Sequence, residues 1–573
     1  MTNDVFDPNQ LSLISTRIWE SKYRLYNDSI KETAIEQSWR RVANTLAGPE
    51  KQQAYWREKF FQILSDWSFL PAGRILAGAG AENHRITLLN CFVMGAIRDS
   101  MPGISRSLRQ SAITLQQGGG IGLDFSSLQP AGSSPLHLGP VALLQIWDRL
   151  CAALAAGGSR RGAMLASLRC DHPDIEAFVR AKSLAASLIH FNLSVQISDD
   201  FMRAVAEDTG WQLCFPPGIA TGPTIKARDL WELILQSAYE GGEPGVLFVD
   251  SINRTNNLAY CEHLTTTNPC GEVPLPPFGA CDLGSINLSQ LVSRPFSEAC
   301  AFQWQRLESI CTTAVRMLDN VLEISNFPLR QQRRCALQSR RIGLGITGLA
   351  DCLQMLGLAY DSPEARQFAT ELMTRIRDAA YAASVELAGE KGCFPCFDQK
   401  NYLRSTYIRS LPLSLQHTIG KKGIRNSHLL AIAPAGSISL LANNVCSGIE
   451  PMFSPGYWRH IRFSKQQESL WLEPYGVHMW RHLNPGKALP DTMVAAGDLT
   501  PRAHLDMQAC LQPLVDNAIA KTINVRADLP FVQFRDIYRQ AFQLGLKGVT
   551  VYRPNRVRPN VLEPEQGCKP SVC

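Results

Sequence analysis

From Leu70 to about Tyr552 the sequence alternates between short apolar or β-branched runs, bounded by glycine-rich turns, and longer segments with helical spacing. Expected strands cover 87–93 and 191–197, and an expected helix covers 302–324. We find neither an internal repeat nor a Pro- or Ser-rich linker in this stretch. Strands that alternate with helices are typical of an α/β protein. The pattern predicts one large α/β domain, and spacing alone leaves open whether it is a barrel or an open sheet.

The two ends of the chain differ from this body. Apolar residues recur at helical spacing over 8–66, which predicts an N-terminal helical region over 1–69 before the α/β body of 70–552. Residues 553–573 are polar and Pro-rich, as is typical of a flexible tail, and they carry Cys568 and Cys573.

Composition excludes several classes of protein. The formal charge is only +6 over 573 residues, and 45% of the residues are hydrophobic, which argues against a disordered chain and a nucleic-acid-coating protein. The acidic start lacks the features of a signal peptide, and no apolar run approaches the roughly 18 residues of a membrane span. We therefore expect a cytoplasmic protein without membrane or nucleic-acid partners, in which the 17 Cys stay mostly reduced.

The densest group of chemically useful residues lies at 267–274. Two Pro and a Gly exclude a helix there and favour an extended loop, in which Asn268, Cys270 and Glu272 point to the same side. A carboxylate two residues from a thiol favours the neutral S–H form, so one-electron chemistry fits Cys270 better than attack by a thiolate. Glu272 can then accept a proton from a substrate hydroxyl. A surface turn with an incidental Cys explains the spacing equally well.

Four other cysteines stand out. Cys91 and Cys281 lie in strand-like segments, where each taken alone fits a small buried hydrophobic residue. Cys568 and Cys573 have C-x4-C spacing on the tail, and a mobile dithiol of this kind can exchange with a disulfide elsewhere. The alternatives for the tail pair are an incidental metal site or an inert terminus.

Further motifs are weaker. Residues 433–439 offer free backbone N–H groups and hydroxyls, which suit a phosphate, whereas the glycine run 118–122 lacks the Lys of a P-loop and fits turns better. The Cys-x-x-Cys at 393–396 has no second pair at zinc-site spacing, so a packed turn is favoured. Arginine pairs that suit either phosphate contacts or a solvated face lie at 160–161, 333–334 and 340–341.

Several of these segments, taken together and in order, resemble the catalytic chain of ribonucleotide reductases. The matching segments are 89–93, 118–122, 160–164, 268–272, 281–288, 434–439, 447–451 and 521–524. Each is weak alone, but the ordered set is specific and runs through the whole α/β body. The resemblance implies a ten-stranded α/β barrel of two half-barrels, with a central finger loop that presents Cys270 as a transient thiyl radical.

The resemblance also implies roles for the other residues. The thiyl removes the 3′ hydrogen of the ribose, Glu272 accepts the 3′-hydroxyl proton and Asn268 holds the substrate. The 2′-hydroxyl leaves as water while Cys91 and Cys281 become a disulfide. The tail pair re-reduces this disulfide and passes the oxidation to thioredoxin or glutaredoxin. The residues that match substrate contacts are Asn90, Gly119, Pro434, Ala435, Gly436, Ser437, Ile438 and Ser439.

The source of the radical separates the classes of this family. Enzymes with a separate radical-carrying subunit have two adjacent tyrosines where 550–553 here has one, and the glycyl-radical class needs a C-terminal glycine loop where this tail has a dithiol. The resemblance therefore indicates an adenosylcobalamin-dependent ribonucleoside-diphosphate reductase that supplies deoxyribonucleotides for DNA replication and repair. The alternatives are the large subunit of a two-protein enzyme and a catalytically silent nucleotide-binding regulator.

Several properties stay open at this point. The chain has no room before its barrel for an ATP-binding cone, which argues against overall control by ATP and dATP. Specificity control by deoxynucleotides at a homodimer interface follows only by analogy. No protein ligand for a metal is predicted, because none of the 11 His lies in a recognisable cobalamin motif. The sequence leaves open whether diphosphates or triphosphates are the substrates.

Overall fold

Helices fill the first part of the chain, as its apolar spacing predicts. The computed structural model describes residues 12–27, 30–81, 87–133, 137–156, 162–182, 188–463, 466–554 and 562–564. The first helices are α1 (Leu13–Lys22), α2 (Ile35–Leu46) and α3 (Gln53–Ser65). The buried residues of α2, which include Ile35, Trp39 and Val42, recur every three or four positions and so face one core.

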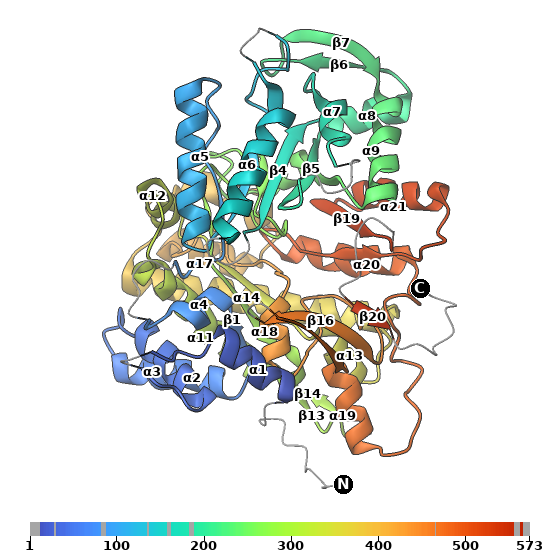
Figure 1. Ribbon diagram of the computed structural model, residues 1–573. Helices are drawn as coiled ribbons and strands as arrows, with labels where there is room; N and C mark the ends of the chain where they lie inside the picture. The colour runs from blue at the N-terminus through green and yellow to red at the C-terminus, as the bar shows by residue number, and fades with distance from the viewer. Residues whose placement is uncertain are drawn as a thin grey trace.

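Five parallel strands form the first α/β half, in the upper part of Figure 1. They are β2 (Cys91–Val93), β3 (Gly120–Asp124), β4 (Met164–Arg169), β5 (Phe191–Ile197) and β8 (Gly245–Phe248). Helices between them include α5 (Met101–Gln116), α6 (Gly139–Ala156) and α9 (Ala227–Gly241). Their apolar faces pack with the strands into one hydrophobic core.

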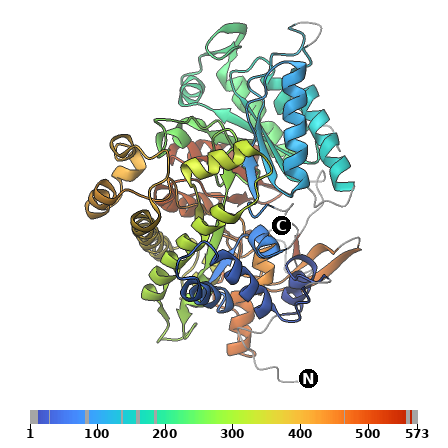
Figure 2. The same ribbon diagram turned by 90° about the vertical axis from the view of Figure 1, so that its left-hand side faces the viewer.

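The second half has its own core, which it shares with the N-terminal helices. Strand β12 (Leu283–Asn287) pairs with β15 (Gly343–Thr347) in parallel and with β1 (Phe69–Pro71) in antiparallel orientation. The long helices α11 (Trp304–Ile324) and α14 (Pro363–Lys391) pack against each other in this half. Figure 2 shows the N-terminal helices lying against the same half.

The two halves are joined by antiparallel strand pairs. Strand β19 (Gly548–Tyr552) pairs with β8 and in parallel with β18 (Thr522–Asn524), and β11 (Ala280–Cys281) pairs with β2. The larger sheet therefore has eight strands and the sheet of β1, β12 and β15 has three. These ladders confirm an α/β body, and closure into a ten-stranded barrel stays a prediction.

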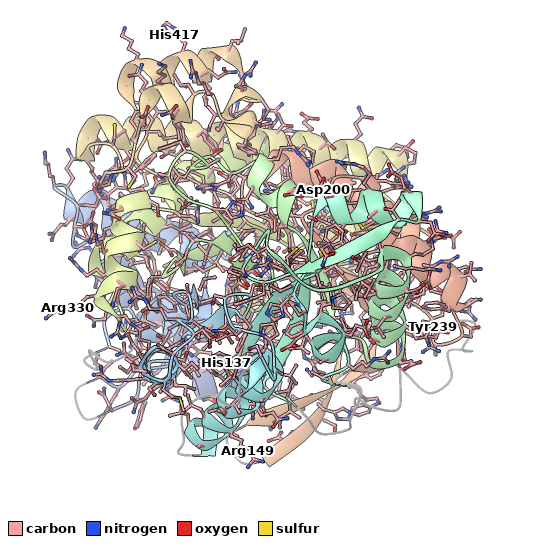
Figure 3. All side chains as sticks on the ribbon, turned by 90° about the horizontal axis from the view of Figure 1, so that it is seen from above. His137, Arg149, Asp200, Tyr239, Arg330 and His417 are labelled. Carbon is pink, nitrogen blue, oxygen red and sulfur yellow. The ribbon has the colours of Figure 1, made fainter. Side chains whose placement is uncertain are left out.

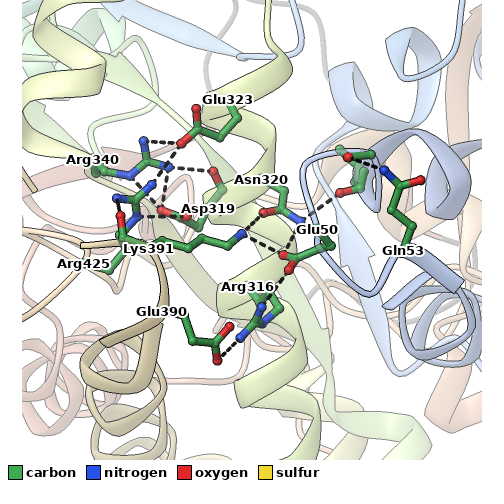
Figure 4. A network of polar contacts seen from close by, with 12 residues as sticks. Glu50, Gln53, Arg316, Asp319, Asn320, Glu323, Arg340, Glu390, Lys391 and Arg425 are labelled. Atoms are coloured by element: carbon green, nitrogen blue, oxygen red, sulfur yellow. Dashed lines mark hydrogen bonds and ion pairs between the residues drawn. The ribbon is translucent and has the colours of Figure 1, made fainter. Parts of the chain in front are cut away.

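A buried network of charges ties the N-terminal helices to the second half (Figure 4). Glu50, which follows α2, accepts hydrogen bonds from Arg316 at 2.7 Å, Asn320 at 2.8 Å and Lys391 at 2.7 Å. Burial opposes ionisation, but the bonds from Lys391 and Asn320 hold the pKa of Glu50 below its usual 4.5. A charge buried this deeply is tolerated only while it stays paired.

The buried arginines at 340 and 341 correct one sequence interpretation. Arg340 is buried and pairs with Asp319 at 2.8 Å, and Arg341 is buried and contacts Glu262 at 2.5 Å. Neither arginine lies on a solvated face, and both have structural carboxylate partners in place of phosphate. Arg333 of the second pair is exposed. The Arg160 pair lies outside the described residues.

Several polar side chains lie at the periphery of the molecule. Figure 3 shows Arg149, Asp200, Arg330 and His417 at the periphery, and all four are exposed. Among the helices of the described residues, none combines the length and the apolar character that a membrane span requires.

Candidate active site

A β-hairpin presents the residues of the 267–274 motif. Strand β9 (Thr266–Thr267) pairs with β10 (Pro274–Leu275), so the motif is a tight turn and the expectation of an extended loop was wrong. Two features reverse the chain there: the Asn268 side-chain oxygen accepts a hydrogen bond from the Val273 N–H at 3.0 Å, and Gly271 has a φ of 84°. We call residues 266–275 the finger.

Both halves of the body hold the finger. The Asn192 side chain on β5 donates a hydrogen bond to the Pro269 carbonyl at 3.2 Å. From the second half, the Ala518 N–H donates to the Glu272 carbonyl at 2.8 Å. The tip of the finger is therefore fixed between two cores that fold from different parts of the chain.

Two glycines of the 118–122 run allow close contacts with the site. A Cβ at Gly122 would lie 1.9 Å from the Thr267 carbonyl oxygen, so the finger reaches β3 only because this residue has no side chain. Gly118 has a φ of 88°, and a Cβ there would lie 2.5 Å from the guanidinium carbon of Arg74. Arg74, which the sequence analysis missed, thus lies over the run, and its charge offsets part of the rise that burial causes in the pKa of Cys91.

Cys91 and Cys281 are direct cross-strand partners. The register of β11 and β2 pairs Cys281 with Cys91, and opposed residues in antiparallel strands have Cα atoms roughly 4.5–5.5 Å apart. This range lies within the usual span of a disulfide, so the two thiols can be joined and separated with little backbone movement. Burial and the nearby Glu272 carboxylate raise the pKa of Cys91 to about 12 and that of Cys281 well above 9.0.

Cys270 lies at the tip of the finger and faces a cavity of about 170 Å³. Cys270 is exposed by its accessible surface, but the protein packed around it desolvates the thiol. That burial, with Glu272 and then Cys91 adding to it, raises the pKa of Cys270 well above 9.0. The residue is therefore a neutral thiol, as the sequence argument expects.

Three buried polar atoms at the site have no hydrogen-bond partner within the described protein. They are the Asn90 side-chain oxygen, the Asn268 side-chain nitrogen and Oε2 of Glu272. Buried polar atoms are nearly always paired, so this group is suited to a polar ligand. Burial raises the pKa of Glu272 to about 7. Gly119, another expected substrate contact, is buried against the Phe92 ring.

The expected phosphate segment begins a short helix, α18 (Gly436–Leu441). The first N–H groups of a helix have no partner within it, which leaves those of Gly436 and Ser437 for a ligand. Other groups of the segment are engaged: the Ala435 N–H donates to Ser447 Oγ at 2.7 Å, and the Ser439 hydroxyl donates to the Val445 carbonyl. Pro434 and Ile438 contribute no polar side chain.

Tyr23 connects this segment to the cysteines. Its hydroxyl lies 2.6 Å from Ser437 Oγ and within 3.0 Å of where a Cβ of Gly73 would stand. Gly73 begins α4 (Gly73–Gly78), which carries Arg74 over the glycine run. Helix α1 thus places the phosphate segment on the side of the body where Cys91 lies.

The cavity behind Cys270 contains polar groups that the sequence did not single out. Its lining includes Gln512, whose buried side-chain oxygen has no partner within the described residues, and the exposed Thr550. Lys547 also lines it, and burial lowers the pKa of this lysine to about 7. No local pattern marks these residues, because the cavity forms only when distant segments meet.

Two of the matching segments, 447–451 and 521–524, are bound to each other. Lys521 donates to Glu450 at 2.5 Å, and the Thr522 N–H donates to the same carboxylate at 2.8 Å, which fixes β18 to the 447–451 segment.

The other cysteine motifs show no metal site. In the described ranges, Cys393 and Cys396 belong to no cluster of three metal-binding side chains, and no such cluster occurs there. Cys568 and Cys573 lie outside the described residues.

Comparisons with known proteins agree with this geometry. The family model described as "Ribonucleotide reductase, barrel domain" matches residues 89–552, and "Ribonucleotide reductase, all-alpha domain" matches 9–84. A "Vitamin B12-dependent ribonucleoside-diphosphate reductase" of Mycobacterium tuberculosis (strain CDC 1551 / Oshkosh) is 36% identical over 96% of this chain and 80% of its own length. A protein of the same name from Thermoplasma acidophilum is 33% identical over 88% of this chain and 66% of its own. The chain belongs to the ribonucleotide reductase family.

Proposed function

We propose that this chain is the catalytic chain of an adenosylcobalamin-dependent ribonucleotide reductase that acts on ribonucleoside diphosphates and supplies DNA precursors. The observation that carries the proposal is the cross-strand pair of Cys91 and Cys281 beside a finger that holds Cys270 and Glu272. The names of the relatives support both the substrate class and the cofactor.

The residues divide the chemistry among themselves. A thiyl at Cys270 takes the 3′ hydrogen of the ribose, and Glu272 accepts the proton of the 3′-hydroxyl. The 2′-hydroxyl leaves as water. Cys91 and Cys281 give up two hydrogen atoms in total and become a disulfide, so that one ribonucleotide and two thiols yield one deoxyribonucleotide, one disulfide and one water. The Asn268 side-chain nitrogen and Asn90 are available to orient the ribose.

The cavity beside Cys270 fits the adenosyl part of the cofactor. Gln512 offers an unpartnered oxygen there, Gly245 and Gly548 keep its walls free of side chains, and Thr550 adds a hydroxyl. When bound, adenosylcobalamin supplies a one-electron oxidant through homolysis of its Co–C bond. Thr550 lies in the 550–553 segment, where enzymes of the two-protein class have two adjacent tyrosines. Its small side chain leaves the cavity open.

The finer architecture is part of the same proposal. The isolated parallel bridges Leu344 to Leu430 and Ile432 to Ile519 extend the second half beyond β15, which supports a ten-stranded barrel of two half-barrels. We divide the chain into a helical region at 1–69, the barrel at 70–552 and a redox tail at 553–573. A cytoplasmic location, a homodimer, deoxynucleotide effectors and reduction by thioredoxin or glutaredoxin stay predictions.

One assay tests substrate and cofactor together. The purified chain is incubated with each of the four ribonucleoside di- and triphosphates, with and without adenosylcobalamin, with dithiothreitol as reductant. We expect deoxynucleotide from the diphosphates only when the cofactor is present. Turnover that ignores adenosylcobalamin and needs an added radical-carrying subunit would instead assign the chain to the two-protein class. Nucleotide binding without turnover in either case would indicate a silent regulator.

A further inference from the structure

A three-stranded sheet lies outside the two halves of the body. Strands β16 (Tyr457–Phe463) and β17 (Gln466–Leu472) form an antiparallel hairpin in which Trp458 and Trp471 are cross-strand partners with ring centroids 5.6 Å apart. Arg17 on α1 forms an ion pair with Glu468 on β17. The hairpin is thus held in place from the N-terminal helices and is not a loose extension.

The third strand comes from the C-terminal tail. Strand β20 (Leu562–Pro564) pairs with β16 in antiparallel orientation, with Leu562 opposite Arg459 and Pro564 opposite Tyr457 (Figure 1). Without β20 the outer edge of β16 would present unpaired N–H and C=O groups, and such an edge binds an extended peptide readily. The sheet therefore contains a docking edge, and the segment on it belongs to this chain.

The register gives the direction in which the tail leaves. The chain enters the pairing opposite Arg459 and exits opposite Tyr457, at the base of the hairpin. The Tyr457 hydroxyl donates a hydrogen bond to the Asn444 side chain at 3.1 Å, and Asn444 lies three residues beyond α18. Pro564 thus lies near the C-terminal end of α18, the helix whose first residues belong to the expected phosphate segment.

The tail is also anchored upstream. The Arg553 guanidinium stacks over the Tyr239 ring, 4.0 Å from its centroid, and Figure 3 shows Tyr239 at the edge of the first half. Measured from Arg553 alone, Cys568 could reach about 50 Å along an extended chain. With β20 docked, Cys568 stays within about 14 Å of the base of the hairpin, because it is the fourth residue after Pro564. Confinement to a smaller volume raises the effective concentration of the dithiol near that base.

We propose that the outer edge of β16 is a docking surface for this chain's own tail, which keeps Cys568 and Cys573 near the base of the hairpin while they reduce the active site. The inference rests on the proposed function. In the step it serves, the Cys568 and Cys573 thiols give two electrons and two protons to the Cys91 to Cys281 disulfide. That disulfide becomes two thiols, the tail pair becomes a disulfide, and an external protein dithiol then reduces the tail.

The full-length chain with Glu563→Pro tests the docking. Glu563 lies at the centre of the pairing, opposite Trp458, and proline removes its backbone N–H. The matched control, Glu563→Ala, keeps that N–H and removes only the carboxylate. Each protein is assayed with adenosylcobalamin and ribonucleoside diphosphate, once with thioredoxin and once with dithiothreitol, which reduces the active-site pair without the tail.

We expect Glu563→Pro to lower thioredoxin-supported turnover about threefold to tenfold while dithiothreitol-supported turnover stays unchanged, and Glu563→Ala to match the unaltered chain. Hydrogen exchange should show faster exchange in 457–463 for the proline variant alone. Equal thioredoxin-supported turnover in all three proteins, or unchanged exchange in β16, would overturn the docking. A complete lack of turnover with dithiothreitol in the unaltered chain would instead refute the proposed function, so the two failures are distinguishable.

Discussion

The ionisation of Glu272 gives the sharpest prediction. Burial raises the pKa of this carboxyl from 4.5 to about 7, so its proton-accepting form is a minority below neutral pH. About a tenth of the molecules carry the carboxylate at pH 6 and about nine-tenths at pH 8. If Glu272 accepts the 3′-hydroxyl proton, the rate of the chemical step rises about tenfold over this interval. A carboxyl with the usual pKa would give a flat profile.

The assay is a single turnover of prereduced protein without external reductant. This design removes the pH dependence of the reductant, and the thiols of the site do not interfere because the pKa of Cys91 is about 12. Glu272→Gln should lower the single-turnover rate at pH 8 by a hundredfold or more and abolish the tenfold rise. A flat profile between pH 6 and pH 8, or a glutamine variant within threefold of the unaltered chain, would refute the role of this residue.

Stability provides the control for this variant. The folded chain binds a proton at Glu272 more tightly than the unfolded chain, so the contribution of this group to stability falls as the pH rises from 4.5 to 7. The difference corresponds to about 3 kcal/mol at most. Glu272→Gln escapes this penalty and should unfold no more easily than the unaltered chain at pH 8, as measured by chemical denaturation. Lost activity therefore does not reflect unfolding.

Three further perturbations follow from the structure. In the first, a chain with blocked tail cysteines makes one turnover without reductant, and its free thiols are then titrated. We expect the unaltered chain to lose two thiols. The Cys281→Ser variant should lose none, since Cys91 then has no cross-strand partner. Gly122→Ala should lower turnover more than tenfold with little change in circular dichroism, because its Cβ would lie 1.9 Å from the Thr267 carbonyl and displace the finger. Glu50→Ala should cost up to about 3 kcal/mol in chemical denaturation, because it removes the carboxylate partner of Lys391 and leaves Arg316 with Glu390 alone. Since the pKa of Glu50 is lowered, the unaltered chain should lose this contribution as the pH falls below about 4.5, whereas Glu50→Ala should not show that acid-dependent loss. The loss of a thiol pair in Cys281→Ser, full activity in Gly122→Ala or unchanged stability in Glu50→Ala would contradict the respective argument.

Much of the local structure could be predicted from the sequence, because short-range periodicity decides it. The run at 191–197 is β5 over its full length, and the helical spacing at the start of the chain corresponds to α1, α2 and α3. The run at 87–93 shortens to a three-residue strand, since only Cys91 to Val93 meet partners in the sheet. Positions whose partners lie nearby in sequence were thus predictable.

Contacts between distant segments were decided only by the tertiary structure. Local patterns identified Cys91, Cys281 and the 267–274 motif as separate candidates, and only the family resemblance paired the two cysteines. Their shared strand register is a property of the tertiary structure. The cavity with Gln512 and the pairing of β20 with β16 depend on residues a hundred or more positions apart. The physical reason is that periodicity reports which face of an element is buried, whereas the partner on that face is set by how the two cores pack together.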